Sequence, residues 1–207
     1  MEVLDQLAWA LGLSTLAGLN LYLTTFVTGL AIRFNWLSLA ERYGDLEILA
    51  HPAILTVAGV LFLLEFFADK IPWIDSAWDV LHTIIRPIGG ICLALAALGE
   101  LDPAFSVVAA LLAGGSTLTT HLAKAGGRFF VNLSPEPVSN ILVSSAEDGF
   151  VLASLGTLAF APIPALIFFV LFLGFAAWLL FRTQRFFRSG LRKIFRREAK
   201  PSLTHEQ

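Results

Sequence analysis

The sequence predicts an all-α polytopic membrane protein with about six transmembrane helices. Of its 207 residues, 57% are hydrophobic and 14% are charged, and the mean hydropathy is +0.76. A soluble domain carries roughly a quarter charged residues, and a disordered chain is poor in apolar ones, so both classes are excluded. At about 20 apolar residues per crossing, the length allows about six helices and no separate soluble domain. The single cysteine excludes a disulfide framework.

The first three apolar segments supply three of the expected crossings. Residues 7–32 carry no charge and follow an acidic start, which predicts a retained helix because a signal peptide begins with basic residues. The second segment opens at Pro52 and contains Glu65. The third, 87–99, has only 13 residues, so we expect residues 76–86 to lengthen it to a full crossing.

Three further apolar segments complete the expected bundle. They cover residues 103 to about 123, 138 to about 160, and 163–181. Pro162 and Pro164 separate the last two, because proline removes a backbone donor and clashes with the preceding turn. We therefore expect a transmembrane domain over residues 1–183 and a basic tail over residues 184–207.

The basic residues indicate an orientation. Arg33 and Arg42 lie in the first expected loop, and the other 12 of the 14 Lys and Arg lie on the side of the tail. The positive-inside rule makes the tail side cytoplasmic, and six crossings would place both termini there. The tail interleaves basic and aromatic residues, which favours anionic lipid headgroups of the bilayer over nucleic acid as its partner.

Two matching stretches indicate an internal repeat. Residues 23–34 and 118–129 both begin with Leu-Thr-Thr and end with Arg-Phe, 95 residues apart. A duplication would give two three-helix units, residues 7–101 and 103–183, that face opposite ways in the membrane, as in many secondary transporters. The alternative is coincidental use of Leu, Thr and Phe in apolar helices.

Two adjacent carboxylates, Glu147 and Asp148, lie about 14 Å into the fifth expected helix, near the middle of the membrane core. Ionisable groups are costly there and are functional by default; the alternative is an ion pair that only fastens helices. Asn140 and Ser144 continue this polar stripe at helical spacing. The first and fourth helices add the other groups of the predicted binding site: Asn20, Thr24, Thr25, Thr119, Thr120, His121 and Lys124. The threonines would have no such role if each only bonded the carbonyl four residues earlier.

A second polar cluster is expected at the cytoplasmic interface, as a vestibule of this site. Its residues are Asp69, Lys70, Asp75, Asp79, His82, Arg86, Arg128, Asn132 and Glu136. Asp75, Asp79 and His82 share one helical face, which suits a divalent cation or a proton relay. The alternative is an interfacial amphipathic helix whose polar face meets water. No phosphate-binding or hydrolase motif is present, and no cofactor is evident beyond a bound cation or a coupled proton.

Three stretches of the sequence carry a resemblance to a known protein family, namely residues 18–25, 69–79 and 132–140. They resemble the small bacterial membrane proteins grouped as domain of unknown function 4126, and the likeness covers about residues 7–182. The resemblance implies a multi-pass protein of the bacterial inner membrane. It implies no activity.

Two functions follow from the predicted sites. The preferred one is a transporter or channel for a small polar or ionic solute, with the carboxylates of the fifth helix as its site. The alternative is a membrane enzyme or flippase that clamps a lipid headgroup with Lys70, Arg86, Lys124 and Arg128. A third hypothesis is an accessory subunit that only packs against another membrane protein. The chain is short for a complete alternating-access transporter, which is consistent with a homodimer.

Overall fold

The structure is a computed structural model that describes residues 2–36, 44–132 and 137–198, and every element within these ranges is helical. The elements are α1 (Glu2–Arg33), η1 (Gly44–Ala50), α3 (Pro52–Ala68), α4 (Pro72–Leu98), α5 (Pro103–Asn132), α6 (Pro137–Phe160) and α7 (Pro162–Glu198). Helices α3 to α7 all begin at a proline, whose fixed φ suits the first turn and whose missing N–H is not needed there. Proline therefore sets the start of five helices.

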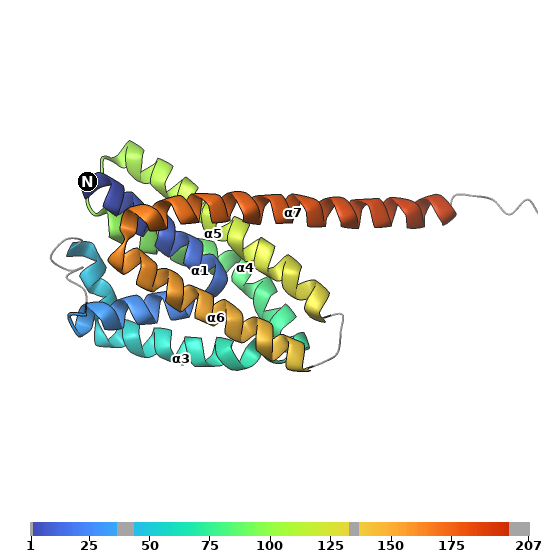
Figure 1. Cartoon of the computed structure of the whole chain (residues 1–207), viewed down its shortest axis with the longest axis horizontal. Coiled ribbons are helices and arrows are strands. Elements are labelled where there is room, and N and C mark those ends of the chain that lie inside the picture. The colour runs from blue at the N-terminus through green and yellow to red at the C-terminus, as the bar shows by residue number, and fades with distance from the viewer. Residues whose placement is uncertain (1, 37–43, 133–136, 199–207) are drawn as a thin grey trace, which may run out of the picture.

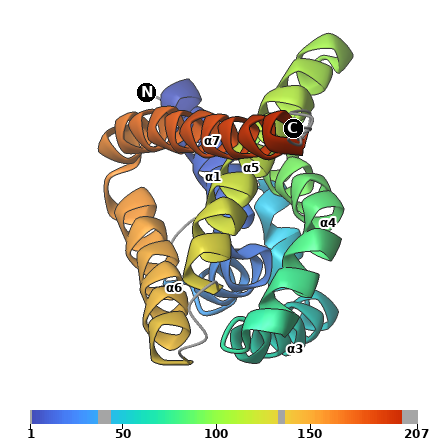
Figure 2. The same cartoon turned by 90° about the vertical axis from the view of Figure 1, so that its right-hand side faces the viewer.

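Helix α1 is broken near its middle. Asn20 has φ −151° and ψ 99°, which is extended backbone inside a helical segment. The chain reverses there: residues before Asn20 run inward from the end marked N, and residues after it return to the same end (Figures 1 and 2). Packing agrees, because Gly12 lies against Phe169 near the start of α7, whereas Gly29 lies against Leu49 of η1. The first apolar segment is therefore a helical hairpin rather than the single crossing expected.

The expected count of six crossings is not confirmed. By length and composition alone, five described helices could cross a membrane, namely α1, α4, α5, α6 and α7, and α3 is a shorter apolar helix. The reversal at Asn20 divides α1 into two shorter halves. Helices α3 to α7 run along the bundle in alternating directions, so α1 begins at one end and α7 runs out at the other (Figure 1). A common, cytoplasmic side for both termini is not shown by this arrangement and stays a prediction.

The other segments follow the sequence with shifted bounds. The short third segment is part of α4, which includes residues 76–86 and carries Pro87 in its interior, as a full crossing required. Helix α5 runs past the expected end near residue 123 to Asn132, and α7 runs past residue 181 to Glu198. The 3-10 helix η1 was not predicted.

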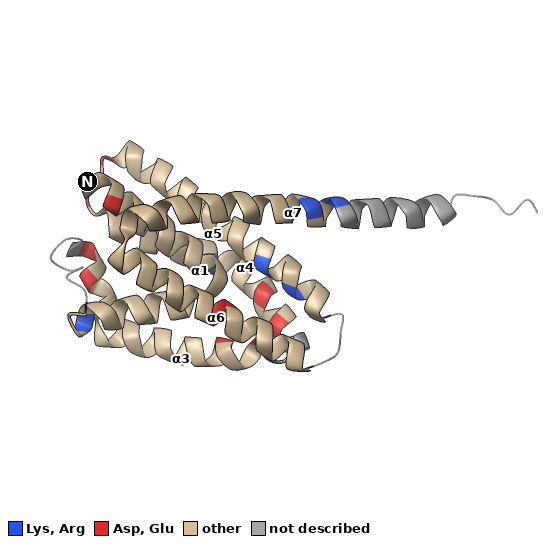
Figure 3. Ribbon diagram, in the orientation of Figure 1, with Lys and Arg blue, Asp and Glu red and all other residues tan. Residues whose placement is uncertain are grey.

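The inverted repeat is also not confirmed, because α1 is broken and α5 is one continuous helix of 30 residues. Helix α1 lies at the centre of the molecule, in contact with α3, α4, α5, α6 and α7. The outer helices expose apolar side chains, as a lipid-facing surface requires. Charged residues lie near one end of the bundle and again in the half of the bundle toward which α7 runs out (Figure 3).

Candidate functional site

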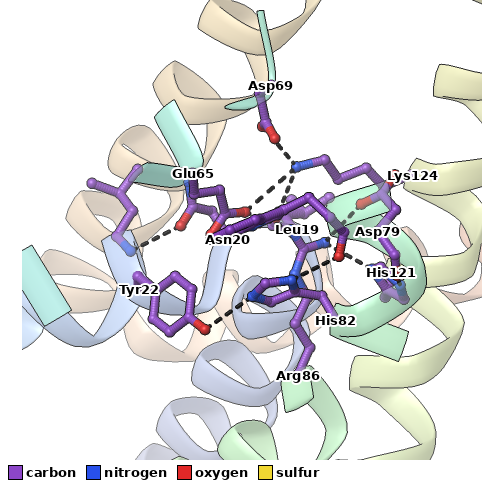
Figure 4. A network of polar contacts seen from close by, with 12 residues as sticks. Leu19, Asn20, Tyr22, Glu65, Asp69, Asp79, His82, Arg86, His121 and Lys124 are labelled. Carbon is purple, nitrogen blue, oxygen red and sulfur yellow. Dashed lines mark hydrogen bonds and ion pairs between the residues drawn. The ribbon is translucent and has the colours of Figure 1, made fainter. Parts of the chain in front are cut away.

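The break in α1 frees backbone carbonyls in the middle of the bundle. The last carbonyls of a helix have no intrahelical partner and attract cations. Here the Gly18 carbonyl accepts a hydrogen bond from Arg86 Nη1 at 3.0 Å, and the Leu19 carbonyl accepts one from Lys124 Nζ at 2.9 Å (Figure 4). Two cations, from α4 and α5, thus satisfy the end of the first half of α1.

Asn20 begins the second half of α1. Its Oδ1 accepts a hydrogen bond from the Leu23 backbone N–H at 2.9 Å, which is the geometry of a helix N-cap. Its Nδ2 donates to Asp148 Oδ1 at 3.0 Å. One buried side chain therefore starts a half-helix and ties the break to α6.

Close helix crossing also requires small residues at the break. A Cβ on Gly18 would lie 2.5 Å from the Thr117 carbonyl oxygen of α5, and one on Gly89 would lie 2.5 Å from Leu21. The backbone contact at Gly18 leaves no room for an added methyl group, and at Gly89 the Leu21 side chain would have to shift. Glycine at these positions lets α4 and α5 approach the reversal closely.

Arg86 is the centre of a first group of buried contacts. Its Nη2 lies 2.5 Å from Glu65 Oε1, its Nη1 lies 3.8 Å from Asp79, and both partners come from the helices beside α1. Arg86 Nη1 also lies 2.8 Å from His121 Nδ1. Because a guanidinium only donates, Nδ1 is the unprotonated nitrogen of His121, and its Nε2–H donates to the Asp79 carbonyl at 3.1 Å. Arg86 therefore fixes His121 as a neutral imidazole.

His82 has the opposite tautomer. Its Nδ1 lies 2.8 Å from the Trp78 carbonyl oxygen, which only accepts, so Nδ1 carries the proton. Its Nε2 lies 2.9 Å from the Tyr22 hydroxyl, which then donates to it (Figure 4). His82 and Tyr22 thus link α4 to the second half of α1.

Lys124 joins four elements at the break. Besides the Leu19 carbonyl, its Nζ lies 3.3 Å from Asp69 of the α3–α4 connection, 3.4 Å from Glu147 of α6 and 3.9 Å from Glu65 of α3. Its side chain is 1% exposed. A buried cation that shares several carboxylates is strongly held by them.

Arg128 lies toward the start of α6. Its Nη2 and Nε bind the two oxygens of Asp75 at 2.8 and 3.2 Å, a bidentate pair. Asn132 Nδ2 donates to the same carboxylate at 2.8 Å. Arg128 also donates to the Asp69 and Asn140 carbonyls, which connects α5 to both neighbouring segments.

Carboxylates exceed cations in this network. The described residues contribute six carboxylates, Glu65, Asp69, Asp75, Asp79, Glu147 and Asp148, and three buried cations, Arg86, Lys124 and Arg128. Asp69 lies outside the spans. Burial raises the pKa of Asp69, but the attraction of Lys124, Arg128 and Arg86 outweighs burial and holds that pKa below its usual value.

Two cavities approach the break from different sides. The larger, about 1470 Å³, lies between the second half of α1, η1, α3 and α4, and its lining includes Leu21, Tyr22 and Cys92. The smaller, about 290 Å³, lies between α5, α6 and α7, and its lining includes Leu19, Lys124, Arg128 and Glu147. Residue 19 faces one cavity and residue 21 the other, so Asn20 lies between them.

A model of the protein family described as Domain of unknown function (DUF4126) matches residues 7–182. The chain belongs to this family. Searches of the curated proteins and of the solved structures find no match. The described parts of the three stretches that carry the family resemblance belong to this network: residues 18–25 contain the break, Asp69 and Asp75 lie in the second, and Asn132 and Asn140 in the third.

Most side chains expected at the two sites do come together. The predicted binding site and the predicted vestibule form one network at the α1 break, rather than two separate clusters. The predicted residues that make contacts in it are Asn20, Asp69, Asp75, Asp79, His82, Arg86, His121, Lys124, Arg128, Asn132, Asn140, Glu147 and Asp148. Ser144 is buried on the same face of α6. Glu136 lies outside the described residues.

The threonines and Lys70 are arranged otherwise. The hydroxyls of Thr24, Thr25 and Thr120 each donate to the carbonyl four residues earlier, at 2.7, 2.8 and 3.0 Å, as the structural alternative required. Thr119 is half-buried on α5. Lys70 Nζ donates to the Phe66 carbonyl at 3.0 Å and lies over the Phe66 ring. Thr24, Thr25 and Thr120 thus bond within their own helices, and Lys70 bonds the end of α3.

The divalent-cation alternative gains no support from the arrangement of side chains. Asp75 binds Arg128, Asp79 lies beside Arg86, and His82 contacts Tyr22. Within the described part of the chain, no group of three or more His, Cys, Asp or Glu is placed to hold a metal ion.

Sequence reasoning missed two members of the network, Glu65 and Tyr22. Glu65 is 0% exposed and pairs with Arg86. Its signal was a lone acid inside an apolar run, which marks a functional group in a membrane helix. Tyr22 carries no such signal, because aromatic residues are common in membrane segments.

Proposed function

We propose that the protein is a transporter or channel for a small ionic solute, whose path passes the break in α1. The observation that carries the proposal is the position of this break: two half-helix ends meet a buried network of charges between two cavities. Broken helices with their ends at the membrane midplane are a common way to build solute sites in secondary transporters. Charged groups inside spans are costly and usually line such a path.

Glu147 is the carboxylate that a solute in the smaller cavity meets. Its side chain is 20% exposed and lines that cavity, whereas the Lys124 and Arg128 side chains are each 1% exposed. Lys124 pairs with Glu147 at 3.4 Å and also holds the Leu19 carbonyl. A solute that competes for Glu147 would therefore alter the cation that satisfies the broken helix. This coupling connects binding in the cavity to the conformation of α1.

The lipid-headgroup alternative needs cations that are free to clamp phosphate. Each of the three buried cations of the network already binds at least one carboxylate. Lys70 is the remaining candidate, and its ammonium contacts Phe66. No observation in the described residues favours this alternative over transport.

Flux into proteoliposomes tests the proposal. Purified protein is reconstituted, and uptake of radioactive Na⁺, Rb⁺ and Cl⁻ and the signal of an internal pH dye are followed for the wild type, Glu147→Gln and the matched control Glu100→Gln. Glu100 is an exposed acid in the α4–α5 connection. We expect flux of at least one ion in the wild type and the control, and at least tenfold less in Glu147→Gln. Absence of flux in the wild type, or equal flux in Glu147→Gln, would contradict the proposal.

The only cysteine of the chain gives a test without substitution. Cys92 is exposed and lines the larger cavity. If that cavity is a water-filled part of the path, a membrane-impermeant maleimide labels Cys92 in sealed vesicles from the η1 side. Labelling only after the membrane is dissolved would show that the cavity is filled by lipid instead.

A further inference from the structure

The face of α6 toward the interior carries polar atoms that the protein leaves unpaired. Asn140 and Ser144 are each 0% exposed. Within the described residues, neither the amide nitrogen and oxygen of Asn140 nor the hydroxyl of Ser144 has a hydrogen-bond partner. An unpaired buried polar group costs about 1–3 kcal/mol, so three such atoms along one helix indicate a ligand or water beside them.

Asp148 completes this face. Asn140, Ser144 and Asp148 follow at intervals of four residues, so they lie on one side of α6 over about 12 Å. Asp148 Oδ1 accepts from Asn20 at the break, and its Oδ2 has no partner among the described residues. In the same part of the chain, no Lys, Arg or His nitrogen forms an ion pair with Asp148. The half-buried Asp148 carboxylate thus has no ion-pair partner among the described residues, although the charges of Lys124 and Lys70 are near enough to attract it.

The surroundings favour a positive ligand. Carboxylates exceed buried cations in the adjoining network, as described above. A carboxylate and a hydroxyl are hard oxygen ligands, which suit alkali and alkaline-earth cations. A single carboxylate with neutral oxygens gives the charge balance of a monovalent ion, whereas divalent cations usually take several carboxylates.

We propose that Ser144 and Asp148, one turn apart on α6, bind a small monovalent metal cation of the size of Na⁺ next to the α1 break, with Asn140 one turn farther along the same face. This proposal rests on the proposed function, because it names the ion that would move along the path or drive the movement of another solute. The Asn20 hydrogen bond to Asp148 couples this cation site to the start of the second half of α1. Binding at Asp148 therefore acts on the element that the transport path crosses.

Binding is tested in detergent, apart from any flux. The melting temperature of the full chain is measured against Na⁺, Li⁺ and K⁺ at fixed pH, with choline chloride to keep ionic strength constant, and binding of radioactive Na⁺ is measured directly. We expect Na⁺ to raise the melting temperature of the wild type saturably. We expect Asp148→Asn to abolish this shift while keeping an oxygen that accepts from Asn20.

Neighbouring serines provide the matched control. Ser144 is buried on the proposed face, and Ser145 is exposed on another face of the same turn. Ser144→Ala should raise the dissociation constant for Na⁺ at least tenfold, and Ser145→Ala should leave it within twofold.

The proposal is overturned if the wild type responds to no alkali cation, if it responds to pH alone, or if both serine variants weaken binding equally. Saturable Na⁺ binding without flux in proteoliposomes would refute the transport function and leave the cation site standing. Flux without saturable Na⁺ binding would refute the cation site and leave the transport function standing.

Discussion

Helices α1 and α5 share a sequence pattern and differ in structure. Both carry Leu-Thr-Thr followed by Arg-Phe at the same spacing, yet α1 reverses at Asn20 while α5 continues through the corresponding position, Gly115. In α1 the Asn20 side chain caps the next turn. Gly115 has no side chain with which to cap, and nothing lies within 4 Å of a Cβ built on it.

The break in α1 depends on polar groups that other helices supply. Reversal frees the Gly18 and Leu19 carbonyls, and Arg86 and Lys124 satisfy them from α4 and α5. In the continuous α5, the Thr117 hydroxyl lies 2.8 Å from the Ala113 carbonyl oxygen of its own helix and 2.7 Å from the Ser14 carbonyl oxygen of α1. A polar residue permits the break, and buried cations from neighbouring helices stabilise it.

The largest expected effect comes from removing one of these cations. Arg86→Met leaves the buried Glu65 with only Lys124, at 3.9 Å, and the Gly18 carbonyl without its donor. Loss of one member of a buried pair costs about 3–5 kcal/mol. The free energy of unfolding in detergent micelles measures it. Arg33→Met is the control, because Arg33 is exposed and an exposed site changes stability by about 0.5 kcal/mol or less. Equal losses in both variants would show that the charge network does not stabilise the break.

Matched glycine substitutions sharpen the comparison of the two helices. Gly18→Ala places a Cβ 2.5 Å from the Thr117 carbonyl oxygen, and overpacking of this kind costs about 1–3 kcal/mol. Gly115→Ala meets no atom within 4 Å, and alanine favours a continuous helix by about 1 kcal/mol. Thermal unfolding should therefore shift down for the first variant and up for the second. A shift in the same direction for both would contradict the difference between α1 and α5.

Hydropathy predicted the helices of this fold well, because apolar length alone decides which segments stay in a membrane. It extended the short third segment correctly into α4. It could not predict the reversal in α1, since residues 7–32 are uncharged and long enough to cross, and the donors that stabilise the break lie more than 60 residues away in sequence.

The sequence could predict which residues belong to the candidate site, but not which of them contact one another. Polar residues in apolar helices, such as Glu147 and Lys124, were found because the membrane makes them rare. Which residues pair with one another depends on which helices are in contact, and the sequence does not give these contacts. The predicted binding site and vestibule were therefore separate, although Lys124 forms ion pairs with both Asp69 and Glu147. Glu65 was left out of the predicted site because its partner Arg86 lies on a different helix.

A smaller effect is expected from the cap itself. Asn20→Ala removes the hydrogen bond to the Leu23 N–H and the one to Asp148, and loss of an N-cap costs about 0.5–2 kcal/mol. The charge-exchanged double variant Asn20→Asp with Asp148→Asn restores a cap oxygen at 20 and an amide donor at 148. We expect thermal stability to recover in the double variant beyond that of Asn20→Asp alone. If the double variant is less stable than Asn20→Asp alone, then Asn20 does not act by capping the second half of α1 and bonding residue 148 of α6.

The smallest expected effect is a pH dependence at Asp69, whose partner Lys124 brings α5 to the break in α1. The cations around Asp69 hold its pKa below the usual value despite burial. A carboxyl with a lowered pKa in the folded state stabilises the fold fully above its unfolded pKa of about 3.9 and loses that contribution as pH falls through the folded value. The difference in unfolding free energy between wild type and Asp69→Asn should thus be constant from pH 7 to about 5 and shrink in more acidic buffer. A difference that grows on acidification would mean that burial, rather than the cations around it, dominates at Asp69.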